Sequence, residues 1–316
     1  APRGSAAMMV SAVVEPGAPQ AAEPVKVTVL EPPAPEVARP SGFAAPVAPV
    51  AKVISSVDAA PAPVAAPAAV KSPPTGEGGA WRDAWKEGQE LVAAGKWFEA
   101  RVPLTRAILA APEGADREQI KAALDKINEE LVFSPRPTPD SVMHTVAPGD
   151  SYWLLSQKYN TPIGLLKRIN KKTSDSLRAR ERLKVLQGEW SALVQKSKFR
   201  LIILFNNQYV KEFSVAIGQY DRTPEGVFEI DSKQEKPVWY SPEGGVYAYG
   251  DPKNILGTRW LGFKDTADFR GYGIHGTPFP ETIGKAASNG CIRLRNAEVE
   301  EVYDLLRKGD KVTIVP

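Results

Sequence analysis

The sequence has 316 residues, which is long enough for two or three domains rather than one. Its charge is nearly balanced, with 40 Lys and Arg against 37 Asp and Glu, and this argues against nucleic acid as the main partner. The single cysteine excludes an internal disulfide framework, and no apolar run approaches the roughly 18 residues that a membrane-spanning helix needs. The first residues lack a complete signal-peptide pattern, so we expect any export or anchoring segment to lie upstream of Ala1.

Residues 1–79 have the composition of a disordered linker. They hold 15 of the 29 prolines, much alanine, and one aromatic residue, Phe43. Such a segment cannot bury enough apolar surface to offset the entropy lost on ordering. We therefore expect a partly extended tether ahead of the folded part of the chain.

Residues 80–133 change to a helical pattern with strong apolar periodicity. The spacing of Gly88, Leu104 and Pro112, together with the alanines between them, resembles a tetratricopeptide repeat, which implies two antiparallel helices followed by a third. Pro103 inside the second helix departs from that pattern. The segment is either a docking module, for a protein partner or a second copy of the chain, or a structural helical hairpin.

Residues 143–187 predict a compact β-α-α-β unit, in which a Pro-Gly turn leads into the first helix. This order resembles a LysM module, a peptidoglycan- and chitin-binding unit. The resemblance implies that glycan is bound beside the first turn, by Gly149, Asp150 and Ser151. The second loop of the groove, usually Pro-Gly-Gln, is here Ala-Arg-Glu-Arg at 179–182. His144 has no neighbours at metal-ligand spacing, and we interpret it as a packing or surface histidine.

Residues 190–316 are rich in short strands. The stretch "RLIILFNNQYVKEFSVAIG" predicts two strands around an Asn-Asn turn, and "NAEVEEVYDLLRKGD" predicts one amphipathic helix. The runs indicate a β-sandwich with a helix packed against it. The whole chain is therefore expected to be a multidomain α+β protein with a linker, a helical region, a β-α-α-β unit and a β-rich domain.

The stretch "HGTPFPETIGKAASNGCIRLRN" contains Cys291, the only cysteine, and His275, one of two histidines. A histidine that takes the proton of a thiol creates a nucleophilic thiolate. Gly290 leaves room for successive backbone amides to face one point, where they could hold an oxyanion. The alternative is a buried, inert cysteine near an unrelated histidine, and the residues alone leave both readings open.

The same stretch resembles the motif of the L,D-transpeptidase catalytic domain, in which His-Gly and a short loop precede Ser-His-Gly-Cys, an apolar residue and Arg. The likeness covers residues 190–316 and includes "IGQYDRTPEGVFEI". It implies that Cys291 is the nucleophile, that His275 activates it, and that a carbonyl near Gly271 orients the imidazole. It also implies an oxyanion hole built from the amides of Asn289, Gly290 and Cys291.

Other positions of the motif imply supporting roles. Arg293 would shape the site or meet a substrate carboxylate, and Ser288 would fix the turn by hydrogen bonding. In a flap over residues 236–254, Trp239, Tyr240 and Tyr247 are candidate peptide contacts, although core packing would explain each of them at least as well. Asn289 replaces the histidine of the motif, and we expect activity to survive because its oxyanion role uses the backbone amide.

These resemblances imply an extracytoplasmic L,D-transpeptidase of the cell envelope or periplasm, without cofactor or metal. It would release D-alanine from a stem tetrapeptide, form a thioester on Cys291, and make 3→3 cross-links, with glycan strands held by the LysM module. The alternatives are an L,D-carboxypeptidase using the same cysteine, a cysteine amidase acting on another wall amide, and a non-catalytic wall-binding protein. An activated Cys291 is expected to ionise below the usual thiol range.

Overall fold

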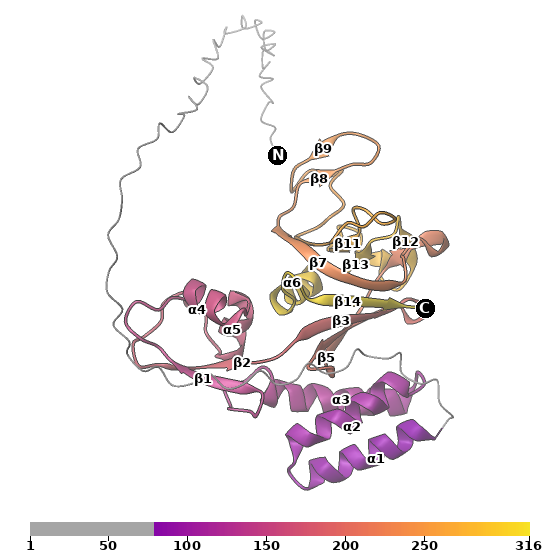
Figure 1. The fold of residues 1–316 in the computed structure, drawn as a ribbon. Coiled ribbons are helices and arrows are strands. Elements are labelled where there is room, and N and C mark those ends of the chain that lie inside the picture. The colour runs from indigo at the N-terminus through magenta and orange to yellow at the C-terminus, as the bar shows by residue number, and fades with distance from the viewer. Residues whose placement is uncertain (1–78) are drawn as a thin grey trace, which may run out of the picture. The chain divides into compact units, whose positions relative to one another are not determined.

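The computed structural model describes residues 79–316 (Figure 1). The expected linker, residues 1–79, lies outside the described residues except for Gly79. The described α-helices are α1 (Ala80–Ala93), α2 (Trp97–Ala110), α3 (Ala115–Leu131), α4 (Tyr152–Tyr159), α5 (Ile163–Ile169) and α6 (Asn296–Leu305). Within residues 79–316, no helix combines the length and the hydropathy that a membrane crossing requires.

The β-rich region is built on one mixed, eight-stranded sheet in the order β13-β11-β10-β7-β14-β3-β4-β5. Its strands are β3 (Trp190–Gln195), β4 (Arg200–Phe205), β5 (Gln208–Ser214), β7 (Gly226–Glu235), β10 (Arg259–Phe263), β11 (Gly273–His275), β13 (Ile292–Arg293) and β14 (Lys311–Val315). Two-stranded pairings join β1 (Ser141–Thr145) with β2 (Arg182–Leu186), β6 (Ile217–Gly218) with β12 (Ala286–Ser288), and β8 (Trp239–Tyr240) with β9 (Val246–Tyr247).

The predicted hairpin around the Asn-Asn turn is confirmed as β4 and β5. Asn206 and Asn207 both have positive φ angles, 51° and 61°, as a tight turn between right-twisted strands requires. Strand β4 is apolar without interruption because both of its faces are buried. Leu201, Ile203 and Phe205 face the main core with α6, whereas Ile202 and Leu204 face the N-terminal helices.

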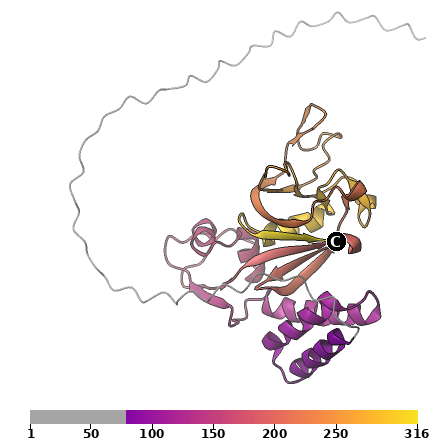
Figure 2. The same cartoon turned by 45° about the vertical axis from the view of Figure 1, so that its right-hand side comes forward.

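The helical segment packs on this second face of the sheet (Figures 1 and 2). Helix α3 and helix α2 contact β5, and α1 packs on α2 as the outer layer. The prediction of three helices over residues 80–133 is confirmed, with Pro103 inside α2. The likeness to a tetratricopeptide repeat stays a prediction, but one face of the segment is already covered by the chain's own sheet.

Gly88 is the point of closest approach between α1 and α2. A Cβ at this position would lie 2.2 Å from Cδ2 of Leu104, a side chain with no exposed surface. We expect Gly88→Ala to lower the free energy of unfolding by about 1–3 kcal/mol, because the enclosed Leu104 has no space to move into. Chemical denaturation would measure the loss. The exposed Gly79 has nothing within 4 Å of its Cβ position, so Gly79→Ala is the matched control. Equal stability of the two variants would contradict this packing.

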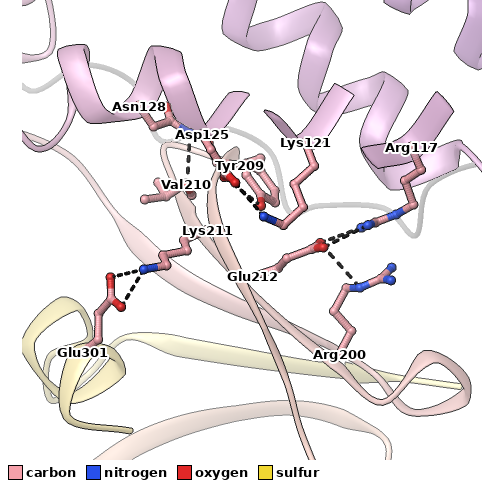
Figure 3. Close-up of polar contacts among 10 residues, drawn as sticks. All are labelled: Arg117, Lys121, Asp125, Asn128, Arg200, Tyr209, Val210, Lys211, Glu212 and Glu301. Carbon is pink, nitrogen blue, oxygen red and sulfur yellow. Dashed lines mark hydrogen bonds and ion pairs between the residues drawn. The ribbon is translucent and has the colours of Figure 1, made fainter. Parts of the chain in front are cut away.

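Hydrogen bonds and ion pairs reinforce the contact between α3 and β5 (Figure 3). Asn128 donates through Nδ2 to the carbonyls of Tyr209 and Val210, at 2.8 and 3.1 Å, where β5 shifts register against β4. Arg117, which is 1% exposed, donates through both terminal nitrogens to the carboxylate of Glu212. The helices therefore supply partners for an edge strand that would otherwise present open backbone groups.

The β-α-α-β unit shares its core with the β-rich domain. Leu166 of α5 lies in the small core of the unit itself, but Leu165 and Ile169 belong to the main core with the sheet and α6. Gly164 lies so close to Asp304 that a Cβ there would be 2.3 Å from its side chain. Arg168 forms an ion pair with Glu301 of α6 at 2.5 Å. The unit is thus packed directly against the domain that follows it.

Candidate active site

A tight turn between β12 and β13 presents Cys291. Ser288 holds the turn closed, since its Oγ donates to the Cys291 carbonyl at 2.6 Å and accepts from the Gly290 amide at 3.0 Å. Gly290 has φ of 135°, and a Cβ there would lie 2.5 Å from the Tyr272 ring. Only glycine fits this position without strain.

The loop after β6 braces the turn from behind. The buried hydroxyl of Thr223 donates to the Gly290 carbonyl at 2.8 Å and accepts from the Gly218 amide at 2.7 Å. Lys196 fixes this loop in turn, because its ammonium group contacts Asp221 at 2.5 Å and Glu225 at 2.8 Å. The "GQYDRTPEG" stretch therefore acts as a support for the turn that bears the cysteine.

His275 reaches the same site from β11, which pairs in parallel with β13 so that His275 lies opposite Arg293. Its ring is 1% exposed, lies beside Trp260, and places Nδ1 2.5 Å from the Gly276 carbonyl. A carbonyl only accepts hydrogen bonds, so Nδ1 carries the proton and Nε2 keeps the lone pair. Burial, and then the positive charge of Arg293, lower the pKa of His275 to about 4, and the ring is neutral at pH 7.

The carbonyl that orients the imidazole is not the one expected from the sequence. We expected Gly271 to orient the ring, but the Gly276 carbonyl does so, and the Gly271 carbonyl lies 3.7 Å from Sγ of Cys291. The carbonyl that contacts Nδ1 belongs to the residue directly after His275, rather than to one upstream of β11. Which carbonyl faces a side chain depends on local backbone geometry, which spacing alone does not contain.

The thiol of Cys291 is also less acidic than expected. Burial raises its pKa above the usual thiol range, and the Gly273 amide and Arg293 oppose this rise only in part. The resting site therefore holds a protonated thiol and a neutral imidazole in one pocket. Such a pair suits proton transfer during nucleophilic attack rather than a thiolate formed in advance.

A pocket of about 480 Å³ opens over these residues. It is lined by Gln234, Val238, Trp239, Tyr240, Pro242, Ile255, Leu256, Trp260, Arg270, Gly271, Tyr272, His275, Ser288, Asn289, Cys291 and Arg293. Of the three flap candidates, Trp239 and Tyr240 line the pocket, whereas Tyr247 stacks on Trp239 from the neighbouring strand. Arg270 and the aromatic residues Trp260 and Tyr272 were not singled out from the sequence.

The three backbone amides expected to form an oxyanion hole differ in their hydrogen bonding. The Gly290 amide already donates to Ser288, whereas within residues 79–316 the amides of Asn289 and Cys291 have no hydrogen-bond acceptor. The side chain of Asn289 is turned toward Arg222, whose Nη1 lies 3.4 Å from Oδ1. Two amides therefore remain to face a developing negative charge beside the sulfur.

Comparisons with known proteins fit this geometry. The model of the L,D-transpeptidase catalytic domain matches residues 189–314, and the LysM domain model matches residues 144–185. YqjB of Bacillus subtilis, whose name places it among the L,D-transpeptidases, is 41% identical over 134 residues, which are 41% of this chain and 73% of the relative. The chain belongs to the L,D-transpeptidase family.

Two further similarities extend the L,D-transpeptidase comparison. YkuD of Bacillus subtilis, which carries the same family name, is 36% identical over 36% of this chain and 58% of its own length. The crystal structure of L,D-transpeptidase 3 from Mycobacterium tuberculosis aligns with a TM-score of 0.35 and 14% identity, over 45% of this chain and 77% of that one.

In the LysM domain, the residues expected to contact glycan are engaged in holding the turn. Asp150 accepts hydrogen bonds from the Ala147 amide and contacts Nε2 of His144, both at 2.8 Å. Ser151 caps α4 by accepting from the Leu154 amide at 3.2 Å. Gly149 has φ of 94°, which the turn requires. The side chains of Asp150 and Ser151 therefore shape the first loop, while the exposed backbone around Gly149 stays open to a ligand.

Proposed function

We propose that this chain is an extracytoplasmic peptidoglycan L,D-transpeptidase that forms 3→3 cross-links through a thioester on Cys291. The observation that carries the proposal is a pocket lined by Cys291, His275 and Asn289, in which the backbone amides of Asn289 and Cys291 have no hydrogen-bond acceptor within residues 79–316. Family membership supports the reaction class, and the LysM domain supports the wall as the place of action.

The first half-reaction acylates the enzyme. Sγ of Cys291 attacks the carbonyl carbon of the third stem residue while Nε2 of His275 takes the thiol proton. The carbonyl oxygen becomes negative and faces the amides of Asn289 and Cys291. The carbon–nitrogen bond then breaks, the imidazolium returns its proton to the leaving nitrogen, and D-alanine departs. No cofactor is needed, because thiol, imidazole and amides supply the whole of this chemistry.

The second half-reaction decides the product. An amine on the side chain of another stem peptide attacks the thioester, His275 removes its extra proton, and the sulfur leaves to recover that proton. A new amide then joins the third residues of two stems. Water in place of the amine would give a shortened stem peptide instead, as an L,D-carboxypeptidase does. Arg293 and Trp239 both line the pocket, where Arg293 would meet a substrate carboxylate and Trp239 would provide an apolar wall for the peptide.

The other modules would place the enzyme on its substrate. A LysM domain that binds glycan strands raises the local concentration of stem peptides without contributing to the chemistry. A protein partner for the uncovered surface of residues 80–133 remains a prediction. The same holds for the location in the cell envelope or periplasm.

The decisive experiment follows the products formed from a disaccharide-tetrapeptide by mass spectrometry, with Cys291→Ala protein as the control. We expect a cross-linked dimer with loss of D-alanine, absent from the control. A tripeptide product alone would replace transpeptidation by carboxypeptidation. Binding to wall sacculi without any turnover would instead favour a non-catalytic wall-binding protein, in which Asn289 marks lost activity.

A further inference from the structure

The pocket over Cys291 carries an unusual charge distribution. Among its described lining residues there are two arginines, Arg270 and Arg293, and no aspartate or glutamate. The remaining walls are aromatic, aliphatic or neutral polar. A pocket with two guanidinium groups and no acid favours a ligand with more than one negative charge.

Arg293 lines this pocket from β13. Its Nη1 contacts the Ala287 carbonyl at 3.3 Å, and its Nε is buried without a hydrogen-bond partner in the described part of the chain. Its charge is close enough to lower the pKa of His275 and to oppose the rise at Cys291. A carboxylate next to the scissile bond would meet this arginine.

Arg270 also lines the pocket, from the loop between β10 and β11. The loop is fixed, because the Gly271 amide donates to Asp265 at 3.0 Å and the Phe269 amide donates to Thr266 at 3.1 Å. Gly271 follows directly, with its carbonyl 3.7 Å from Sγ of Cys291. The Arg270 side chain is exposed and, within residues 79–316, has no hydrogen-bond or ion-pair partner.

We infer that Arg270 determines which stem peptide is used as donor, by binding a free carboxylate on the side chain of the residue that is acylated. This inference rests on the proposed function and names its substrate class. A planar guanidinium binds a carboxylate through two parallel hydrogen bonds. On the donor peptide, neither a neutral amide nor an ammonium group can take the place of that carboxylate. Donors whose third residue is amidated, or is lysine, would lack this contact.

The test compares three tetrapeptide donors that differ only at the third residue, which is meso-diaminopimelate, its side-chain amide, or L-lysine. All three share the terminal carboxylate, so a preference among them reports the side chain alone. We expect kcat/KM for the free carboxylate to exceed the other two by about 10-fold or more, as charged hydrogen bonds usually give. Arg270→Gln should lower kcat/KM for the free carboxylate by a similar factor and leave the other two nearly unchanged. Arg270→Lys should restore part of the preference.

Lys264→Gln is the matched control, because Lys264 is exposed in the same loop but does not line the pocket. Equal values for the three donors in the wild type, or equal losses for all three in Arg270→Gln, would overturn the inference. Binding of the same peptides to Cys291→Ala protein, measured by calorimetry, provides a readout that needs no turnover. If the free-carboxylate peptide binds more tightly than the other two but no turnover occurs, the proposed reaction is rejected and carboxylate recognition by Arg270 is kept. If turnover occurs without a preference among the three donors, the proposed reaction is kept and the inference is rejected.

Discussion

Replacing His275 by asparagine should lower kcat for the acylation of Cys291 by about 10²–10⁴-fold, the usual contribution of a general base. Partial burial raises the pKa of the Cys291 thiol, so very little thiolate is present at pH 7 without a base. The neutral ring of His275 is the only imidazole at the pocket in the described chain. Intact-mass spectrometry after mixing with a donor peptide, sampled over time, would give the acylation rate of each variant.

His144→Asn is the matched control, since His144 is the other histidine of the chain and lies in the LysM domain, hydrogen-bonded to Tyr159 and Asp150. Its acylation rate should match the wild type. A loss of acylation rate below about five-fold in His275→Asn would be smaller than a general base contributes. It would mean that another group takes the thiol proton.

The same histidine sets the acid limit of the reaction. Because its pKa is about 4, the ring should still accept a proton at pH 5.5, and the acylation rate should fall as the pH drops through about 4. The free energy of unfolding should fall over a wider range of pH. Between about pH 6.5 and 4 the unfolded chain binds a proton at His275 that the folded chain does not, and this favours unfolding. Rates below pH 5 therefore need a parallel measurement of the folded fraction.

Arg117→Met should lower the free energy of unfolding by about 3 kcal/mol, because it leaves the carboxylate of Glu212 buried with a weaker partner. In the native pair, Arg117 is 1% and Glu212 9% exposed, and their closest atoms are 2.5 Å apart (Figure 3). Arg200 remains, but its Nε is 3.5 Å from the carboxylate. Methionine keeps most of the side-chain length, so the loss reports the charge rather than a cavity.

Urea denaturation monitored by tryptophan fluorescence and by circular dichroism would measure this loss. Arg106→Met is the matched control in the neighbouring helix, because its ion pair with Glu87 is more than half exposed and is worth about 0.5 kcal/mol or less. Since Ile202 and Leu204 of the sheet share a core with the helices, we expect both probes to report one transition. If the helical signal were lost first, with the sheet intact, the two parts would be independent folding units.

The boundaries of the elements could be predicted from the sequence because local signals determine them. The Asn206-Asn207 turn and the helices over residues 80–133 both follow from residue type and spacing. What covers the second face of β4 could not be predicted in this way. An uninterrupted apolar strand shows that both faces are buried, but the covering helices lie about a hundred residues earlier in the chain.

The residues of the site also divide into those that local sequence predicts and those that it does not. The motif predicted Cys291, His275 and the closing role of Ser288, whose two hydrogen bonds across the turn are present. It misplaced the carbonyl at the imidazole, because this depends on how the chain bends after β11. It also missed Arg270, since a free cation at a pocket has no spacing to mark it. The direction in which the pKa of Cys291 shifts depends on burial, and a short motif carries no information about burial.

Helix α5 fixes the LysM domain to the domain that follows it. Because Leu165 and Ile169 complete the core of the catalytic domain, the module cannot swing on a tether as an appended domain would. A glycan strand held by this module would enter at one orientation and at a constant distance from Cys291. Only the stem peptides that project toward Cys291 at that distance would reach the sulfur. Cross-links would then be spaced along the strand by the enzyme's own geometry.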